Sequence, residues 1–391
     1  RAAAGAPREW AQGPAQAQNL RESLEGTGIN VKVGLRENSS SMELAKAAGF
    51  DKANNTLGEM YTTISESDMV LCLISDAACV SEYTKIFQAL KPGTTFGLSH
   101  GFLLGHLESV GESFPKDCDV IMVAPKGMGP SVRRLYELGR EVNGSGINAS
   151  FAVHQDATGK ATDRALGWAV GVGSPYIFQT TLSSEWRSDI FGERCILLGG
   201  VHGMIESLFR RYETLGMSPE EAFKMSSEVI TGPLTTTISH EGILAVYEKL
   251  STAEREIFKA AYCTSYKPSR DIIEECYDTV SCGNEIRDVC NAVMRHARYP
   301  MSEIDGTRTW QVGKLVRAQG GSAEARKSIP VHPFTAGVYC AMMMAQIDTL
   351  VSHGHVYSEV VNESVIESVD SPTPYMHARG ASDMVDTSSL T

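Results

Sequence analysis

Short apolar segments alternate with helical patterns through the first half of the chain, and this alternation constrains the fold more than any other feature of the sequence. Segments with the composition of strands occupy residues 30–36, 69–74, 94–98 and 120–124. Helical patterns occupy residues 15–26, 41–48 and 81–90. Short apolar strands separated by helices are typical of a parallel sheet with helices on both faces. We therefore expect residues 1–180 to form an α/β domain with a Rossmann-like, doubly wound sheet.

Long helical patterns replace this alternation beyond residue 180. They occupy residues 188–215, 219–230, 242–250, 253–261 and 336–351. Residues 216–230 and 354–368 each follow a long apolar helix and each restart with a Ser-rich cap, which hints at an internally duplicated unit. We expect residues 181–391 to form a second, all-α domain.

The composition restricts the classes of partner that this chain can bind. Asp and Glu number 47 against 35 Lys and Arg, which gives a formal net charge of −12. Proteins that bind nucleic acids or acidic membranes normally carry a basic surface, so we expect neither as a partner. No uncharged apolar run reaches the length of about 18 residues that spans a bilayer. The nine cysteines form no C-x-x-C pair, and we expect reduced, mostly buried thiols of an intracellular or organellar compartment.

Three chemically useful groups stand directly after predicted strands. Arg36 ends the first strand, His100 follows the third and Lys126 follows the fourth. In doubly wound sheets, ligands bind beyond the carboxyl ends of the strands. A single side chain of this kind is more often a solvated loop residue, but three of them at successive strand ends indicate a binding site.

The segment where a dinucleotide fingerprint would stand is incomplete. An intact fingerprint has a strand, the motif G-x-G-x-x-G and a helix whose N-terminus binds the pyrophosphate. Here Gly13, with Gln12 beside it, stands directly before the first helix, and no strand pattern precedes it. About 20 residues further on, where NAD-dependent enzymes place an acid, this chain has Arg36 with Ser39 and Ser41 nearby. A guanidinium and two hydroxyls suit a 2′-phosphate, which favours NADP over NAD.

Two groups of acids have the spacing of a helix face. Glu185, Asp189 and Glu193 are spaced i, i+4 and i+8, and Glu363 and Glu367 are spaced i, i+4. Each step of four residues turns the side chain by only about 40° around the helix, so each group forms a stripe. A solvated acidic face is the ordinary explanation of such a stripe.

Both acidic groups, however, run into apolar sequence. Glu193 precedes the apolar segment 196–198, and Glu363 and Glu367 lie among the valines and isoleucine of 360–366. Acids in apolar surroundings are costly unless they are neutralised. A hard divalent cation neutralises them well, and ligation by carboxylates alone favours Mg²⁺ over zinc. We therefore expect both groups to bind magnesium.

Several longer strings resemble the ketol-acid reductoisomerase (acetohydroxy-acid isomeroreductase) family in its long, plant-type form. The resemblance covers nearly the whole chain, from Gln12 to Ser389. It is carried by the strings GLSHGFLLGHL, VIMVAPKGMGPSVRRLY, GINASFAVHQDATGKATDRALGWAVGVGSP, SDIFGER, ILLGGVHG, PFTAGVY, NESVIES and YMHARG.

This resemblance implies an enzyme of valine, leucine and isoleucine biosynthesis. Members of the family convert 2-acetolactate or 2-aceto-2-hydroxybutyrate into a 2,3-dihydroxy acid, by alkyl migration followed by reduction with NADPH. They use two Mg²⁺ ions and have a knotted helical C-terminal domain. The resemblance also implies a homodimer in the plastid stroma.

The resemblance assigns roles to four of the acids. Asp189 would bridge the two metal ions, Glu193 would complete the first site, and Glu363 and Glu367 would serve the second. Two adjacent Lewis acids can polarise the ketone and the neighbouring hydroxyl at once. An acid beside them can relay the hydroxyl proton, and we expect Glu367 to be that acid.

The same resemblance places other residues around the substrate and the cofactor. Glu185 would lie just outside the metal ligands, while His100 and Lys126 would line the catalytic cleft. NADPH would be bound by Gln12, Gly13, Arg36, Ser39 and Ser41. The substrate would contact Ser389, Glu185, Leu197 and Leu198.

The chain departs from the family at both ends and at one pocket position. Glu9, Trp10 and Ala11 stand where the family's glycine loop is expected, and the family's segment beyond Ser389 is missing. Pro372 stands where the family usually has a leucine of the substrate pocket. We therefore expect a form of the enzyme that is truncated at both ends.

Two other functions stay open on the sequence alone. One is a truncated, catalytically inactive family member that retains only the helical dimerisation domain. The other is a metal-independent dehydrogenase that uses Lys126 and His100 alone, which would have no need of five clustered acids.

Overall fold

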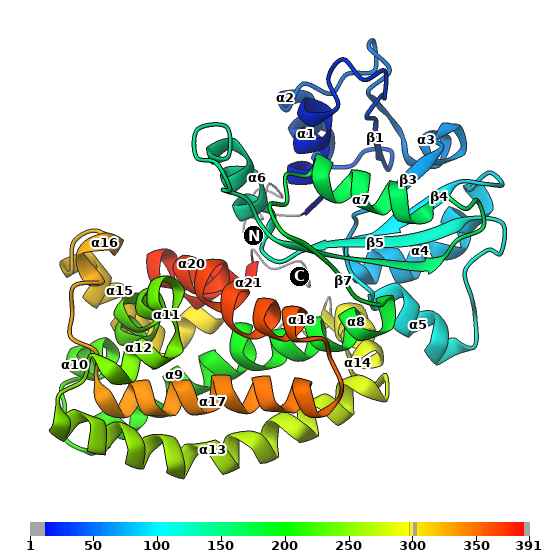
Figure 1. Cartoon of the computed structure of the whole chain (residues 1–391). Coiled ribbons are helices and arrows are strands. Elements are labelled where there is room, and N and C mark those ends of the chain that lie inside the picture. The colour runs from blue at the N-terminus through cyan, green and yellow to red at the C-terminus, as the bar shows by residue number, and fades with distance from the viewer. Residues whose placement is uncertain (1–11, 297, 300–302, 387–391) are drawn as a thin grey trace. The chain divides into compact units, whose positions relative to one another are not determined.

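A computed structural model describes residues 12–296, 298–299 and 303–386 of the chain. The chain divides into two compact units, and each is described by itself. The first unit comprises the chain up to Trp186 together with Ile286–Val293, and the second comprises Arg187–Glu285 and Met294–Asp386. The division falls inside one helix, α8 (Leu182–Gly192), which therefore belongs to both units (Figure 1).

The first unit contains two sheets in which most neighbouring strands run parallel. A two-stranded parallel sheet pairs β1 with β2, and a five-stranded sheet has the order β3-β4-β5-β6-β7. Within the larger sheet, β5 and β6 run antiparallel and the other neighbours run parallel. The strands are β1 (Val33–Leu35), β2 (Leu57–Glu59), β3 (Met69–Cys72), β4 (Thr95–Leu98), β5 (Asp119–Pro125), β6 (Ala149–Gln155) and β7 (Ile177–Gln179).

The predicted α/β domain with a Rossmann-like sheet is confirmed, with two corrections. All four predicted strands form, but β1 pairs with β2 in a separate two-stranded sheet, and the antiparallel pairing of β5 with β6 was not expected. The pairing direction depends on how the connection returns to the sheet, which the apolar pattern of a strand does not encode.

Helices cover both faces of the larger sheet. In β4, successive side chains point to opposite faces. Phe96 packs edge-on against Phe87 of α4, with ring centroids 5.8 Å apart, whereas Trp168 of α7 lies over Gly97 on the other face. Every residue of β5 is buried, as expected of a strand covered on both sides. The helices of this unit are α1 (Gln12–Ser23), α2 (Ser41–Ala47), α3 (Met60–Glu66), α4 (Asp76–Ala89), α5 (Phe102–Val110), α6 (Gly129–Leu138) and α7 (Ala161–Gly171), with α14 (Asn284–His296) shared between the units.

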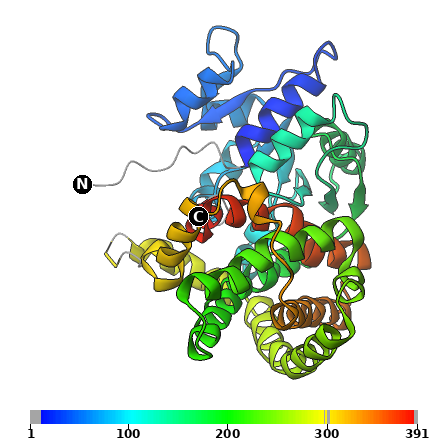
Figure 2. The ribbon, with the colours of Figure 1, turned by 90° about the vertical axis from the view of Figure 1, so that its left-hand side faces the viewer.

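The second unit is built from helices in the part of the chain that the structure describes. Two long helices, α13 (Thr252–Ser281) and α17 (Pro333–Ser352), lie side by side in both views (Figure 1, Figure 2). The others are α9 (Gly199–Thr214), α10 (Pro219–Phe223), α11 (Thr235–Glu241), α12 (Ile243–Glu248), α15 (Arg308–Gln319), α16 (Ala323–Arg326), α18 (Tyr357–Val361), α19 (Glu367–Asp370), α20 (Pro372–Arg379) and α21 (Ala381–Asp386), with a short 3₁₀ turn η5 (Ile304–Gly306).

The helix α17 lies in the core of this unit. Among the described residues it alone is long and apolar enough to cross a membrane by length and composition, and 61% of its most apolar window is buried within the protein. Ala336, Tyr339 and Met343 are fully buried in the same apolar cluster as residues of α9 and α15. The hydropathy of α17 is therefore accounted for by packing against other helices.

Four π-helical turns occur among the described residues of the second unit, and the first two fall within segments that were predicted to be regular helices. They are η2 (Glu193–Leu197), η3 (Lys224–Glu228), η4 (Ile230–Leu234) and η6 (Asn362–Ile366). The single helix predicted over 188–215 is wrong, because η2 contains Cys195 at φ −106° and ψ −109° and separates α8 from α9. The helix predicted over 253–261 is too short, because α13 continues through Pro268, where a proline would ordinarily end a helix.

The two stretches noted for their similarity have the same local structure. The first, at 216–230, contains the five-residue helix α10 followed directly by η3. The second, at 354–368, contains the five-residue helix α18 followed directly by η6.

All nine cysteines are free thiols; four are buried, and only Cys263 and Cys282 are exposed.

Candidate metal and cofactor sites

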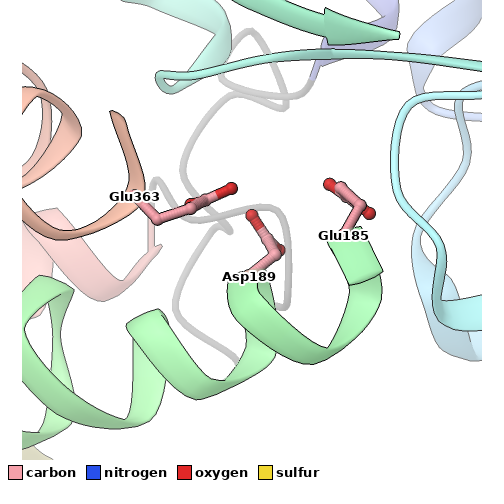
Figure 3. A group of neighbouring side chains, drawn as sticks. All are labelled: Glu185, Asp189 and Glu363. Carbon is pink, nitrogen blue, oxygen red and sulfur yellow. The ribbon is translucent and has the colours of Figure 1, made fainter. Parts of the chain in front are cut away.

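Three acids of the predicted magnesium site lie together. Glu185 and Asp189 lie one turn apart on α8, and Glu363 comes from η6 (Figure 3). Each contributes a carboxylate oxygen that lies within 4.8 Å of the other two. Glu185 and Glu363 are fully buried, and Asp189 is half-buried. Because α8 is one continuous helix, its geometry sets the position of Glu185 relative to Asp189.

The chemistry of this group fits a hard divalent cation. Bringing three carboxylates together away from water is unfavourable unless positive charge compensates them. Carboxylate oxygens are the ligands that Mg²⁺ prefers, and the group has no sulfur or imidazole ligand that would favour zinc. Glu185, Asp189 and Glu363 could therefore hold a magnesium ion.

The other two predicted ligands occupy the adjoining turns. Glu193 is the first residue of η2, and Glu367 is the first residue of α19, directly after η6. Neither belongs to the three-residue group. The structure thus brings together three of the five acids, and a ligand role for Glu193 and Glu367 remains a prediction.

Glu185 is held by groups at the ends of two neighbouring strands. Its Oε1 lies 3.4 Å from Lys126 Nζ, and its Oε2 accepts a hydrogen bond of 2.8 Å from the backbone N–H of Gly101. Lys126 directly follows β5, and Gly101 follows β4 by three residues. A Cβ atom at Gly101 would lie 2.6 Å from the carbonyl oxygen of Leu182 and 2.7 Å from Cβ of Trp186, so a glycine is needed where α8 approaches this loop.

His100 lies beside an acid that the sequence did not single out. Its Nδ1 is 3.8 Å from Oδ1 of Asp76, the first residue of α4, and accepts a hydrogen bond of 3.0 Å from the N–H of Phe102. Because Nδ1 accepts there, the neutral imidazole carries its proton on Nε2. The helix predicted over 81–90 in fact begins at Asp76, which is why this residue was overlooked.

The first turn of α1 is tied to loops that follow the strands. Gln12 donates from Nε2 to the carbonyl oxygen of Gly127 at 2.7 Å, and a Cβ at Gly13 would lie 3.3 Å from the carbonyl oxygen of Leu73, just after β3. Gln16, which the sequence did not suggest, donates to Ser99 Oγ at 2.8 Å and accepts from Trp168 Nε1 at 2.9 Å. The N-terminus of a 12-residue helix therefore lies at the carboxyl edge of the sheet, where an anion can be bound.

The three residues expected to bind the 2′-phosphate of NADPH lie in a tight turn after β1. The N–H of Ser39 donates to the carbonyl oxygen of Arg36 at 3.1 Å, and the N–H of Ser41 donates to Ser39 Oγ at 3.2 Å. Asn38 in this turn has a φ of 60°, which asparagine tolerates better than most residues. Arg36 is exposed while Ser39 and Ser41 are half-buried, an arrangement that can receive a phosphate from solvent.

The residues expected around the substrate differ in where they lie. Leu197 is buried in the apolar core of the second unit, and Leu198 is half-buried against it. Ser389 lies outside the described residues, as do Glu9, Trp10 and Ala11.

Glu359 is a further buried acid that the sequence analysis missed. It accepts a hydrogen bond from Ser188 Oγ, next to Asp189, and its Oε1 lies 3.2 Å from Nδ1 of His355. His355 Nε2 in turn lies 2.7 Å from the hydroxyl of Tyr277. A signal was present, because Glu359 precedes the pair at 363 and 367 with the same four-residue spacing as the stripe on α8.

Both domains match models of one family. Residues 10–176 match the model described as the NADPH-binding domain of acetohydroxy acid isomeroreductase. Residues 182–320 match the model described as the C-terminal domain of ketol-acid reductoisomerase.

Individual relatives agree with these matches. The chloroplastic ketol-acid reductoisomerase of Spinacia oleracea is 56% identical over 388 residues, which cover 97% of this chain and 65% of that protein. The ketol-acid reductoisomerase (NAD(+)) of Desulfosudis oleivorans is 34% identical over 315 residues, covering 78% of this chain and 86% of that protein. The solved structure of an NADH-preferring ketol-acid reductoisomerase from an uncultured archean is similar with a TM-score of 0.68 and 25% identity, covering 80% of this chain and 92% of that one. The chain therefore spans less than two thirds of the spinach protein's length.

Proposed function

The chain belongs to the ketol-acid reductoisomerase family, and we propose that it catalyses the reaction of that family. The substrates would be 2-acetolactate and 2-aceto-2-hydroxybutyrate, and the products the 2,3-dihydroxy acids of valine, leucine and isoleucine biosynthesis. The observation that carries this proposal is the group of carboxylates formed by the buried Glu185 and Glu363 with the half-buried Asp189.

The acids present suit a magnesium-dependent isomerisation. When bound, Mg²⁺ supplies Lewis-acid polarisation of the adjacent ketone and hydroxyl oxygens of the substrate. Asp189, Glu193, Glu363 and Glu367 would hold two such ions, and Glu367 would take the hydroxyl proton as the alkyl group moves.

The first unit contributes charge and hydrogen bonds of its own. The ammonium of Lys126 offsets the charge of Glu185, and the N–H of Gly101 fixes the direction of that carboxylate. The imidazole of His100 is oriented through its Nδ1, and its Nε2–H would donate to a substrate oxygen.

The hydride donor in this proposal is NADPH. The N-terminal turn of α1, with Gln12 and Gly13, would receive the pyrophosphate, and Arg36, Ser39 and Ser41 would bind the 2′-phosphate. The family model for this domain is described as NADPH-binding, which supports a nicotinamide cofactor. Because relatives include an NAD(+) form, the preference for NADPH rests on the turn after β1.

The remaining expectations follow the relatives. A plastid location is supported by the chloroplastic proteins of Spinacia oleracea and Pisum sativum. By resemblance to the family we further infer a homodimer and a knotted second domain. We also infer an internal duplication of that domain, which the shared local structure of α10–η3 and α18–η6 supports. An inactive member that keeps only a helical domain is not favoured, because the family match extends over the NADPH-binding domain as well.

An assay of the purified protein tests this function. We expect NADPH oxidation that requires both Mg²⁺ and 2-acetolactate or 2-aceto-2-hydroxybutyrate, and that stops when the metal is chelated. Turnover of either acid in excess chelator would support the metal-independent dehydrogenase instead. Binding of Mg²⁺ and NADPH without turnover of either acid would show an inactive member and overturn the proposal.

A further inference from the structure

A buried amide on α17 joins two of the π-helical turns. Gln346 is fully buried, and its Oε1 accepts a hydrogen bond of 2.9 Å from the backbone N–H of Ile196 in η2. Its Nε2 donates to Ser364 Oγ in η6 at 3.1 Å. One side chain therefore contacts two turns that are far apart along the chain, and all of these residues belong to the second unit.

The hydrogen bond to η2 provides an acceptor for the backbone N–H of Ile196, at a point where the helix is irregular. The dihedral angles of Cys195, the residue before Ile196, are outside the helical range, so the regular hydrogen-bond ladder breaks at this point. A buried N–H without an acceptor is unfavourable, and the Gln346 carbonyl supplies the acceptor. The carbonyl oxygen of Ile196 accepts a hydrogen bond of 3.4 Å from Ser368 Oγ. Ser368 Oγ also lies 3.2 Å from the hydroxyl of Tyr339.

These two turns carry or adjoin three of the four acids proposed to bind the metal ions. η2 begins at Glu193, while η6 contains Glu363 and is followed directly by Glu367. Both hydrogen bonds of Gln346 go to other groups of the turns, so it reaches the carboxylates only through the backbone that carries them. A primary amide can accept a hydrogen bond at its oxygen and donate one at its nitrogen, as Gln346 does here.

We propose that Gln346 is a positioning residue that holds the turn bearing Glu193 and the turn bearing Glu363 and Glu367 in register for magnesium. This inference rests on the proposed function, since it takes those acids to be metal ligands. Residues that orient metal ligands without touching the ion commonly contribute 10- to 100-fold to metal affinity.

The test replaces the amide with an apolar side chain of similar length. For Gln346→Met we expect Mg²⁺ to bind at least about tenfold more weakly by calorimetry, with NADPH affinity unchanged within about twofold. Bound Mn²⁺ should show an altered electron paramagnetic resonance spectrum, because the carboxylates around it have moved. Ser364→Ala removes only the η6 contact and should give a smaller weakening of the same kind.

The matched control is Thr349→Val, on the same helix. Thr349 is also fully buried, but its hydroxyl donates to Glu274 Oε1 at 3.1 Å on α13 rather than to a π turn. We expect this variant to lose a partly buried hydrogen bond and to bind Mg²⁺ as the unmodified protein does.

The outcomes separate this inference from the proposed function. If the unmodified protein binds no Mg²⁺, the function and the inference both fail. If it binds Mg²⁺ but Gln346→Met and Thr349→Val change that affinity equally, Gln346 is structural only and the inference alone fails. Should Gln346→Met not fold, Ser364→Ala decides, and unchanged Mg²⁺ affinity in that variant overturns the proposal.

Discussion

Lys126 and Glu185 form an ion pair from which water is excluded. The Nζ–Oε1 distance is 3.4 Å, and the two side chains are 1% and 0% exposed. The acid also belongs to the carboxylate group with Asp189 and Glu363, so its charge would be shared between Lys126 and a metal ion bound there. Loss of either partner destabilises the folded protein, because the remaining partner is then a buried charge without a counter-ion.

Replacing Glu185 with glutamine should therefore destabilise the protein. Loss of one partner of a buried ion pair costs about 3–5 kcal/mol in the free energy of unfolding, measurable by urea denaturation. The control is Asp68→Asn, which removes the exposed partner of Lys91 and should leave stability nearly unchanged. Equal, small effects of both substitutions would contradict the buried pair.

Asp189→Asn should weaken magnesium binding while the fold is retained. The substitution removes a ligand charge from the three-carboxylate group, and we expect a loss of about a hundredfold or more in Mg²⁺ affinity by calorimetry. NADPH affinity should not change. Asp271→Asn, at an exposed acid of α13 paired with Lys267, is the control and should bind Mg²⁺ normally. Normal Mg²⁺ affinity in Asp189→Asn would exclude Asp189 as a ligand.

Gly101→Ala should be destabilising, whereas Gly167→Ala should not. A methyl group at Gly101 would lie 2.6 Å from the Leu182 carbonyl oxygen, while nothing lies within 4 Å of one at Gly167 in α7. Overpacking of a close approach costs about 1–3 kcal/mol. An open helical glycine replaced by alanine gains about 0.5–1 kcal/mol. Thermal unfolding tests whether the melting temperature falls for Gly101→Ala and rises for Gly167→Ala. Equal shifts would show that α8 can move away from Gly101 to accommodate the methyl group.

Stability should fall as the pH is lowered through about 6. Burial lowers the pKa of five histidines from the ordinary value of 6.5: His106, His154, His202, His332 and His377. Below 6.5 the unfolded chain therefore binds more protons than the folded protein, so the free energy of unfolding decreases with decreasing pH. Urea midpoints at about pH 7.5 and 5.5 test this, because lowered carboxyl pKa values such as that of Asp119 act only at more acidic pH.

A single variant checks the histidine origin of this dependence. His377 is 1% exposed, and burial lowers its pKa although Glu228 nearby opposes the shift. His377→Gln should give a shallower decrease between the two pH values. An unchanged slope would mean that other groups are responsible.

Arg36→Asp should change the cofactor preference. Arg36 directly follows β1 and lies in the turn that contains Ser39 and Ser41. A charge-assisted hydrogen bond from its guanidinium to a phosphate contributes about 1.5–3 kcal/mol to binding, or roughly 10- to 100-fold in affinity. We expect NADPH to bind correspondingly more weakly and NADH to bind no worse, by fluorescence titration. Lys46→Ala, at an exposed cation of α2, serves as the control. Equal weakening of both nucleotides would place the 2′-phosphate elsewhere.

Much of the first unit could be predicted because its signals are local. The run 120–124 is apolar at every position, and it forms β5, which is buried on both faces. Where structure depends on distant contacts, local signals were insufficient. Pro268 would ordinarily end a helix, yet α13 continues through it because the helix packs along α17.

That Glu185 and Asp189 share a helix face could be predicted from the sequence, since four-residue spacing has that consequence in any helix. That Glu363 joins them, and that Lys126 and Gly101 hold Glu185 from the strand ends, depends on tertiary contacts. Likewise, no spacing pattern indicated that Gln346 would join η2 to η6. Helical periodicity follows from backbone geometry within a few residues, whereas contacts between distant segments depend on the packing of the whole unit.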